Sequence, residues 1–220
     1  MLTSEVQTMQ FYVLREVVGA PHETEFEKDA PVIRGEPAMC PVCKEGFISM
    51  KPWLPPRRAL IRVWGKELGD VAFGPGNELL VSEYFRLAWI EHGLRGLDVF
   101  EPVEVVRLTP ARLARAAPSF HCILPKLGTT SLDFSRSTIE RSGEPDCLFC
   151  GKGSVKNAIH GVVIAEETWG GEDIFRPLGL VGSVIVTSRF REMVAAKSLK
   201  NFGLVPVERY TWPPKDDRAS

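Results

Sequence analysis

The stretch VSEYFRLAWIEHGLRGLDVFEPV, residues 81–103, and the stretch VTSRFREMVAAKSLKNFGLVPV, residues 186–207, follow one pattern. Each starts at the end of an apolar run and continues with a hydroxyl residue suited to cap a helix, Ser82 in the first and Thr187 or Ser188 in the second. Apolar residues then recur at helical spacing, and a second apolar run containing proline ends each stretch. Each stretch is therefore predicted to form a strand end, an amphipathic helix and a returning strand.

The likeness of these two stretches extends along the chain, at an offset just over one hundred residues and with only a few short gaps. The matches join Phe11 to Phe120, Gly35-Glu36-Pro37 to Gly143-Glu144-Pro145, Cys40 and Cys43 to Cys147 and Cys150, and Phe73 to Phe175. Matches that keep their order in this way predict an internal duplication. We expect two repeats, 1–108 and 109–212, followed by a polar tail at 213–220.

Four of the five cysteines form two C-x-x-C pairs, CPVCK at 40–44 and CLFCG at 147–151. This spacing lets two sulfurs turn toward one ion, and four thiolates select zinc or an iron–sulfur cluster over harder ions. An ordinary zinc ribbon separates its pairs by about 15–20 residues, far fewer than here. The duplication accounts for the gap, because each half then supplies half of one site. The predicted ligands of a structural zinc ion are Cys40, Cys43, Cys147 and Cys150.

Two other interpretations of these pairs remain open: a redox pair at a helix N-terminus in a thioredoxin-like unit, or thiols that bind no metal. Gly151 suits the left-handed turn that such knuckles often use, whereas Lys44 makes the first turn less standard. The fifth cysteine, Cys122, aligns with Val13 in an apolar strand. We expect Cys122 to be buried and inert.

Segments rich in aromatic and β-branched residues predict further strands at 10–18, 59–64, 119–124 and 160–165. The apolar faces of the two helices are predicted from Phe85, Ala88 and Trp89 and from Phe190, Met193 and Val194. The expected fold class is α+β. It consists of two tandem similar lobes, related by a pseudo-twofold axis and joined by the shared structural zinc site.

Composition and motifs narrow the possible functions. With 27 basic and 28 acidic residues, a net charge of −1 and a pI of about 6.5, the chain lacks the basic face typical of nucleic-acid-binding domains. It has no apolar run of membrane-spanning length and no signal peptide, which predicts a cytoplasmic protein that does not bind membranes. It contains no nucleophile elbow, H-E-x-x-H, Walker loop or dinucleotide fingerprint. Four cysteines would also close the coordination shell of a zinc ion, so we expect no enzymatic activity.

Acidic residues precede the matched phenylalanines in both copies: Asp70 before Phe73, and Glu172-Asp173 before Phe175. Neither has an evident catalytic partner. We interpret them as capping or turn residues rather than as a general acid and base.

The two knuckles, the FYVLRE strand at 11–16, the D-x-x-F turn at 70–73 and the two helix stretches together carry a resemblance. Over nearly its whole length the chain resembles the double-CXXCG motif immunity proteins of myxobacterial Sit toxin–immunity systems, although Lys44 stands where the family has glycine. The helix stretches are also similar to those of a broader group of polymorphic-toxin immunity proteins. The resemblance implies a non-enzymatic cytoplasmic inhibitor that binds the C-terminal toxic domain of a cognate lipoprotein toxin.

The segment PWLPPRRA at 52–59 lies where the first copy is longer than the second. Because Trp and Arg are enriched at interfaces, we expect Trp53, Arg57 and Arg58 to contact the partner; a solvated proline loop is the alternative. The rival function is a zinc-ribbon nucleic-acid-binding or transcription accessory protein, and a redox protein is third.

Overall fold

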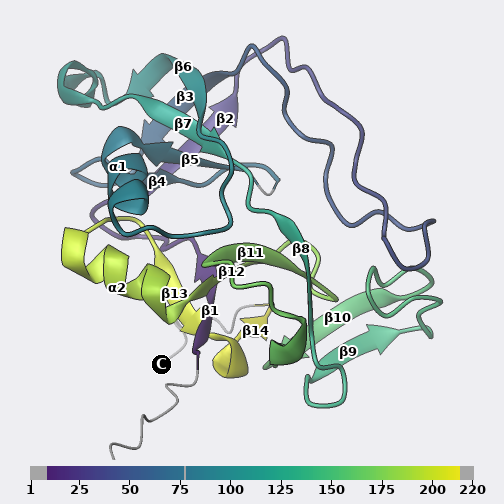
Figure 1. The fold of residues 1–220 in the computed structure, drawn as a ribbon. Coiled ribbons are helices and arrows are strands. Elements are labelled where there is room, and N and C mark those ends of the chain that lie inside the picture. The colour runs from purple at the N-terminus through teal and green to yellow at the C-terminus, as the bar shows by residue number, and fades with distance from the viewer. Residues whose placement is uncertain (1–8, 77, 214–220) are drawn as a thin grey trace, which may run out of the picture.

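Strands dominate the fold, which is mixed α+β as expected (Figure 1). The computed structural model describes residues 9–76 and 78–213, so the predicted tail lies outside the described residues except for Pro213. Within that part of the chain there are two α-helices, α1 (Glu83–Glu91) and α2 (Ser188–Lys197). The strands form three sheets.

The largest sheet has six strands in the order β2-β3-β6-β7-β5-β4. Only the β3–β6 pair is parallel. The strands are β2 (Thr24–Lys28), β3 (Arg58–Val63), β4 (Val71–Ala72), β5 (Leu79–Ser82), β6 (Glu101–Thr109) and β7 (Phe120–Ile123).

The second sheet has five strands in the order β13-β1-β12-β11-β8, and the third has the order β14-β10-β9. The five are β1 (Phe11–Arg15), β8 (Leu127–Ser131), β11 (Ile174–Leu178), β12 (Val184–Thr187) and β13 (Gly203–Pro206). The third sheet contains β9 (Ile139–Ser142), β10 (Val155–His160) and β14 (Thr211–Trp212). Short 3-10 helices are η1 (Ala111–Ala116), η2 (Glu166–Thr168) and η3 (Val207–Arg209).

Each of the two large sheets includes one strand from outside its own half of the chain. The five-stranded sheet of C-terminal strands includes β1, and the six-stranded sheet of N-terminal strands includes β7. Strand β1 lies between β12 and β13, and β7 lies between β5 and β6. The registers correspond, since Phe11 faces Thr187 and Phe120 faces Ser82. The sheets therefore do not separate at residue 108: the first strand of each predicted repeat completes the sheet of the other.

The helices begin at the predicted caps. The Phe85 N–H donates to the Ser82 hydroxyl at 3.1 Å, and the Phe190 N–H donates to the Thr187 hydroxyl at 3.4 Å. The predicted apolar faces are buried at Phe85, Ala88 and Trp89 in α1 and at Phe190 and Met193 in α2. The two faces meet, with the Phe85 and Phe190 ring centroids 6.1 Å apart, and α1 lies beside α2 (Figure 1). One apolar core thus joins both halves.

The strand predicted at 160–165 is wrong in its position. Strand β10 ends at His160, because Gly161 has a φ of +94° and accepts no side chain. A Cβ at Gly161 would lie 2.6 Å from the Glu208 carbonyl oxygen. The apolar residues that follow are buried outside a strand, as Val162 shows at 0% exposure.

Candidate metal centre

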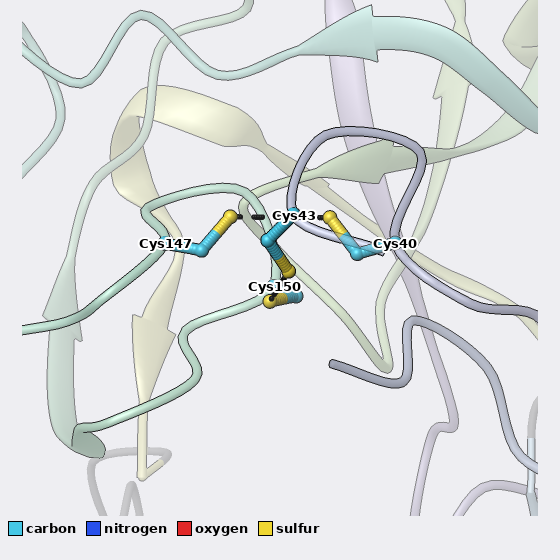
Figure 2. Close-up of side chains that lie close together, drawn as sticks. All are labelled: Cys40, Cys43, Cys147 and Cys150. Carbon is cyan, nitrogen blue, oxygen red and sulfur yellow. Dashed lines mark hydrogen bonds between the residues drawn. The ribbon is translucent and has the colours of Figure 1, made fainter. Parts of the chain in front are cut away.

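Two turns from different parts of the fold bring the four predicted cysteine ligands together. The first turn lies in the long connection between β2 and β3, which runs from the six-stranded sheet to the β9–β10 hairpin that carries the second turn (Figure 1). The sulfur atoms of the four cysteines all lie within 4.8 Å of one another. Figure 2 shows the four side chains, which come from two turns and converge at their sulfur atoms. The cluster therefore bridges the N-terminal and C-terminal halves.

The sulfur distances fit a tetrahedral ion. The Cys40 and Cys147 sulfurs are 3.9 Å apart, and those of Cys43 and Cys150 are 3.6 Å apart. A Zn–S bond of about 2.3 Å places tetrahedral ligands about 3.8 Å from one another. All four are free cysteines. Their number, chemistry and spacing are consistent with a structural metal site.

The two turns share one backbone geometry. The Lys44 N–H donates to the Cys40 carbonyl at 2.9 Å, and the Gly151 N–H donates to the Cys147 carbonyl at 2.8 Å. The residue after each second cysteine is left-handed, with a φ of +59° at Lys44 and +75° at Gly151. Lys44 thus adopts the conformation that glycine takes in the second turn, despite the steric cost of its Cβ.

Gly46 sets the distance between the turns. Its N–H donates to the Cys43 sulfur at 3.4 Å, and its carbonyl accepts from the Cys40 N–H at 2.7 Å. A Cβ at Gly46 would lie 2.5 Å from the Cys150 sulfur. An ion pair between Glu45 and Lys152 also joins the two turns. Gly46 is a site residue that the cysteine spacing does not indicate.

Burial and hydrogen bonding act differently on the four thiols. Cys40 is 1% exposed and Cys147 is 7% exposed, in an apolar cluster with Ile48 and Leu178. Backbone N–H groups of Glu45 and Gly46 lower the pKa of Cys43 to about 6, whereas burial raises the pKa of Cys150 to about 12. Four thiolates this close repel one another in a partly dry site, so a divalent cation is the group that would hold all four ionised.

The surroundings of the turns differ from those of a redox C-x-x-C pair. A thioredoxin-like pair lies at a helix N-terminus, where the helix lowers the thiol pKa. Both turns here connect strands, and neither lies at the start of α1 or α2. The redox interpretation therefore has no support from the local structure.

The fifth cysteine lies apart from this cluster, in strand β7 opposite Leu80. Cys122 is 4% exposed, and burial raises the pKa of its thiol to about 12. The expectation of a buried thiol is confirmed.

The predicted partner contacts have a different outcome. Trp53 is 1% exposed and stacks on Phe26, with ring centroids 6.1 Å apart. The Arg57 side chain is 10% exposed, and its Nη1 atom lies 3.3 Å from a Glu101 oxygen. Trp53 therefore belongs to the apolar core of the six-stranded sheet, and its contact with a partner, like that of Arg57, stays a prediction. Arg58, with 35% of its side chain exposed, stays a prediction.

Two of the acidic residues before the matched phenylalanines, Asp70 and Asp173, accept hydrogen bonds from the residues that cap the helices. The Ser82 hydroxyl donates to Asp70 Oδ1 at 2.8 Å, and the Lys200 N–H donates to Asp70 Oδ2 at 2.9 Å. Asp70 thus joins the cap of α1 to the segment that follows α2. The carboxylate has a structural role, as expected.

Asp173 makes the corresponding contacts at the start of α2. The Thr187 hydroxyl donates to Asp173 Oδ1 at 2.8 Å, and the Arg95 N–H donates to Asp173 Oδ2 at 2.9 Å. Asp173 therefore joins the cap of α2 to the segment that follows α1. Asp173 Oδ2 also accepts a hydrogen bond from Arg189 Nη1 at 3.0 Å.

Comparison with protein-family models and with curated proteins gave no match. Neither described helix has the length and apolar character needed to cross a bilayer. The site is thus characterised by its own geometry.

Proposed function

We propose that this protein is a non-enzymatic immunity protein that binds a cognate toxin domain in the cytoplasm and neutralises it. The observation that carries the proposal is the cysteine cluster, because both C-x-x-C pairs of the double-motif pattern converge on one site. The resemblance of the knuckles, the opening strand and the two helix stretches to the double-CXXCG immunity proteins supplies the function. An inhibitor of this kind needs a rigid complementary surface and no chemistry of its own.

Within this proposal the cluster binds one zinc ion for structural support. The four thiolates match the softness and the tetrahedral geometry that zinc takes in structural sites, and they leave no coordination position for a substrate. Binding energy at such a site adds to folding stability, because the unfolded chain has no preformed site. The ion would hold the long β2–β3 connection against the β9–β10 hairpin.

The proposal also includes the duplication and its pseudo-twofold axis. Corresponding strand registers support it, since Tyr12 faces Val186 and Pro206 in one sheet as His121 faces Val81 and Pro102 in the other. The reciprocal contacts of Asp70 and Asp173 support it as well. Each half would complete the sheet and the helix terminus of the other, which makes one rigid body from two repeats.

Neutralisation inside a cell requires tight binding. A dissociation constant in the nanomolar range corresponds to about −12 kcal/mol, and interfaces that reach it bury on the order of 1,600 Å² in total. A few anchor residues carry most of that energy. Of the predicted contact residues, Arg58 keeps an accessible side chain.

Co-expression with the toxin encoded by the neighbouring gene tests the proposal. The toxin domain should kill cells unless this protein is present, the purified proteins should bind one to one, and a toxin from another allele should escape. If this protein neither binds the neighbouring toxin nor relieves its toxicity, the proposed immunity function is wrong. Salt-dependent binding to RNA or DNA in its place would favour the zinc-ribbon nucleic-acid function.

A further inference from the structure

Three arginines lie on two adjoining elements, strand β6 and the 3-10 helix η1. Arg107 belongs to β6, whereas Arg112 and Arg115 belong to η1, which packs against β6. All three residues are exposed. Because residues i and i+3 of a 3-10 helix eclipse each other, Arg112 and Arg115 point to the same side of η1. In Figure 1, η1 is the teal coil that projects beyond β6.

The opposite side of η1 is anchored to the core of the six-stranded sheet. Leu113 and Ala117 are half-buried and pack against the apolar cluster of that sheet. The Leu113 N–H also donates to the Pro110 carbonyl at 3.0 Å, which closes the first turn of η1. The arginine side of η1 is therefore held toward solvent by a fixed turn.

The positive charge of these arginines is not neutralised within the described part of the chain. None of the three guanidinium groups forms an ion pair there, since the arginine ion pairs involve other arginines. Glu104 of β6 pairs with Arg58 at 3.4 Å, and Glu27 of the nearby strand β2 lies 3.9 Å from Arg62. The sequence contains no Asp or Glu between Glu104 and Asp133, although the whole chain has a net charge of −1.

A cleft of about 400 Å³ lies between β6 and η1, with Arg107 in its wall. Apolar residues form most of the remaining wall: Val103, Val105, Val106, Ala114, Ala117 and Pro118. Val106 is 41% exposed, so an approaching molecule can reach these side chains. The size of the cleft falls within the range of roughly 300–1,000 Å³ that is common for binding pockets. The surface thus combines an apolar recess with exposed positive charge.

The chemistry of this surface favours an acidic protein segment over a nucleic acid. Guanidinium groups pair with carboxylates, and arginine is enriched among the residues that carry binding energy at protein interfaces. Sites that bind single-stranded nucleic acid stack bases on accessible aromatic side chains. The aromatic residue in the cleft wall, Phe120, is 1% exposed and cannot stack on a base.

From this arrangement we infer that β6 and η1 form a docking surface for an acidic segment of a partner protein. Carboxylates of the segment pair with Arg107, Arg112 and Arg115, and an apolar side chain of the segment enters the cleft. The inference rests on the proposed function for the identity of the partner, because the segment then belongs to the toxin domain. The surface itself can be tested without the toxin.

Titration of the ¹⁵N-labelled full chain with a peptide, followed by NMR, tests the surface. The probe is a capped pentapeptide with leucine at its centre and glutamate at the other positions. Backbone amide signals of β6 and η1 should shift, with a dissociation constant in the millimolar range or tighter, because a short flexible ligand loses entropy when it is ordered. Arg112→Gln/Arg115→Gln should weaken binding at least about threefold, since each exposed ion pair contributes modestly.

The matched control is Arg136→Gln/Arg209→Gln, which removes two exposed arginines from other parts of the fold. It should leave peptide binding unchanged. Equal binding of a peptide with glutamine in place of glutamate, or shifts confined to residues outside β6 and η1, would overturn the surface. Tighter binding of a short oligouridylate than of the peptide at β6 and η1 would overturn the protein partner and assign the surface to nucleic acid.

Binding of the toxin domain encoded by the neighbouring gene tests the partner. Arg112→Glu/Arg115→Glu should weaken binding at least about tenfold and reduce its salt dependence, because charges at the edge of an interface steer association. Arg136→Glu/Arg209→Glu changes the net charge equally and should have little effect. Equal binding of wild type and Arg112→Glu/Arg115→Glu would contradict this docking surface but not the immunity function. A toxin that binds none of these proteins would contradict the immunity function, and the peptide titration would still decide the surface.

Discussion

Lys44 follows the second cysteine of the first turn and donates its backbone N–H to the Cys40 carbonyl at 2.9 Å. The sequence places lysine where the second knuckle has Gly151, and this departure alone would argue against a standard turn. The structure keeps the turn and places Lys44 at a φ of +59°. The hydrogen bond from the Lys44 N–H to the Cys40 carbonyl and the convergence of the four cysteines therefore outweigh the preference of lysine for a negative φ.

Replacement of Lys44 by glycine should stabilise the protein. A left-handed backbone costs an ordinary residue about 1–2 kcal/mol, whereas the extra freedom of glycine in the unfolded chain costs about 0.5–1 kcal/mol. Lys44→Gly should therefore raise the free energy of unfolding by about 0.5–1 kcal/mol in denaturant titrations with saturating zinc.

Gly151→Ala is the matched control, because it introduces a side chain at a φ of +75°, with its Cβ 3.0 Å from Arg141 Nη1. It should lower the free energy of unfolding by about 1 kcal/mol or more. A loss of stability in Lys44→Gly would show that the lysine side chain itself supports the turn.

The cysteine ligands could be predicted from the sequence because their chemistry is carried by residue type and short spacing. Trp53 could not be placed in the same way. Its neighbours Arg57 and Arg58 gave the segment the composition of an interface, but Phe26, against which Trp53 is buried, comes from a strand far away in the sequence. Burial depends on such long-range contacts, which composition does not report.

The two helices could be predicted from the sequence, whereas the order of the strands could not. The apolar spacing from Phe85 to Trp89 and the Ser82 cap are local signals, and both appear in α1. The exchange of β1 and β7 between the sheets depends on pairing between distant segments, for which the sequence contains no local signal. The match of Phe11 to Phe120 in the sequence nevertheless agrees with the strand registers, in which Phe11 faces Thr187 and Phe120 faces Ser82.

The carboxylates at the helix termini should be important for stability. Asp173 is 0% exposed and accepts from Thr187, Arg95 and Arg189, so its removal leaves the buried Thr187 hydroxyl and two partly buried donors without this acceptor. Asp173→Ala should lower the free energy of unfolding by about 3 kcal/mol or more, since hydrogen bonds to charged groups contribute about 1.5–3 kcal/mol each.

Asp70→Ala should cost less, about 2 kcal/mol, because Asp70 accepts two side-chain hydrogen bonds rather than three and is only half-buried, so water can replace part of what is lost. Asp98→Ala is the surface control, with 64% of its side chain exposed, and should change stability by less than about 1 kcal/mol. Chemical denaturation of the three variants measures the differences. Equal effects for Asp173→Ala and Asp98→Ala would contradict the structural role of Asp173.

In the whole molecule, the cysteine cluster is one of the contacts that join the β2–β3 connection to the C-terminal half. The connection leaves the six-stranded sheet, and its far end meets the β9–β10 hairpin at the four sulfurs (Figures 1 and 2). A metal ion at this point would join two segments whose other links include the Glu45–Lys152 ion pair. We expect loss of the ion to loosen this end of the molecule while the two-helix core remains.

We propose a single zinc ion shared by both halves, and metal content measured by native mass spectrometry tests this proposal directly. The wild-type chain should carry one zinc ion, because four thiolates make one tetrahedral site. Cys122→Ser should keep that ion. The double variant Cys40→Ser/Cys147→Ser removes one ligand from each half and should carry none, whereas full retention of zinc in this variant would contradict a shared site.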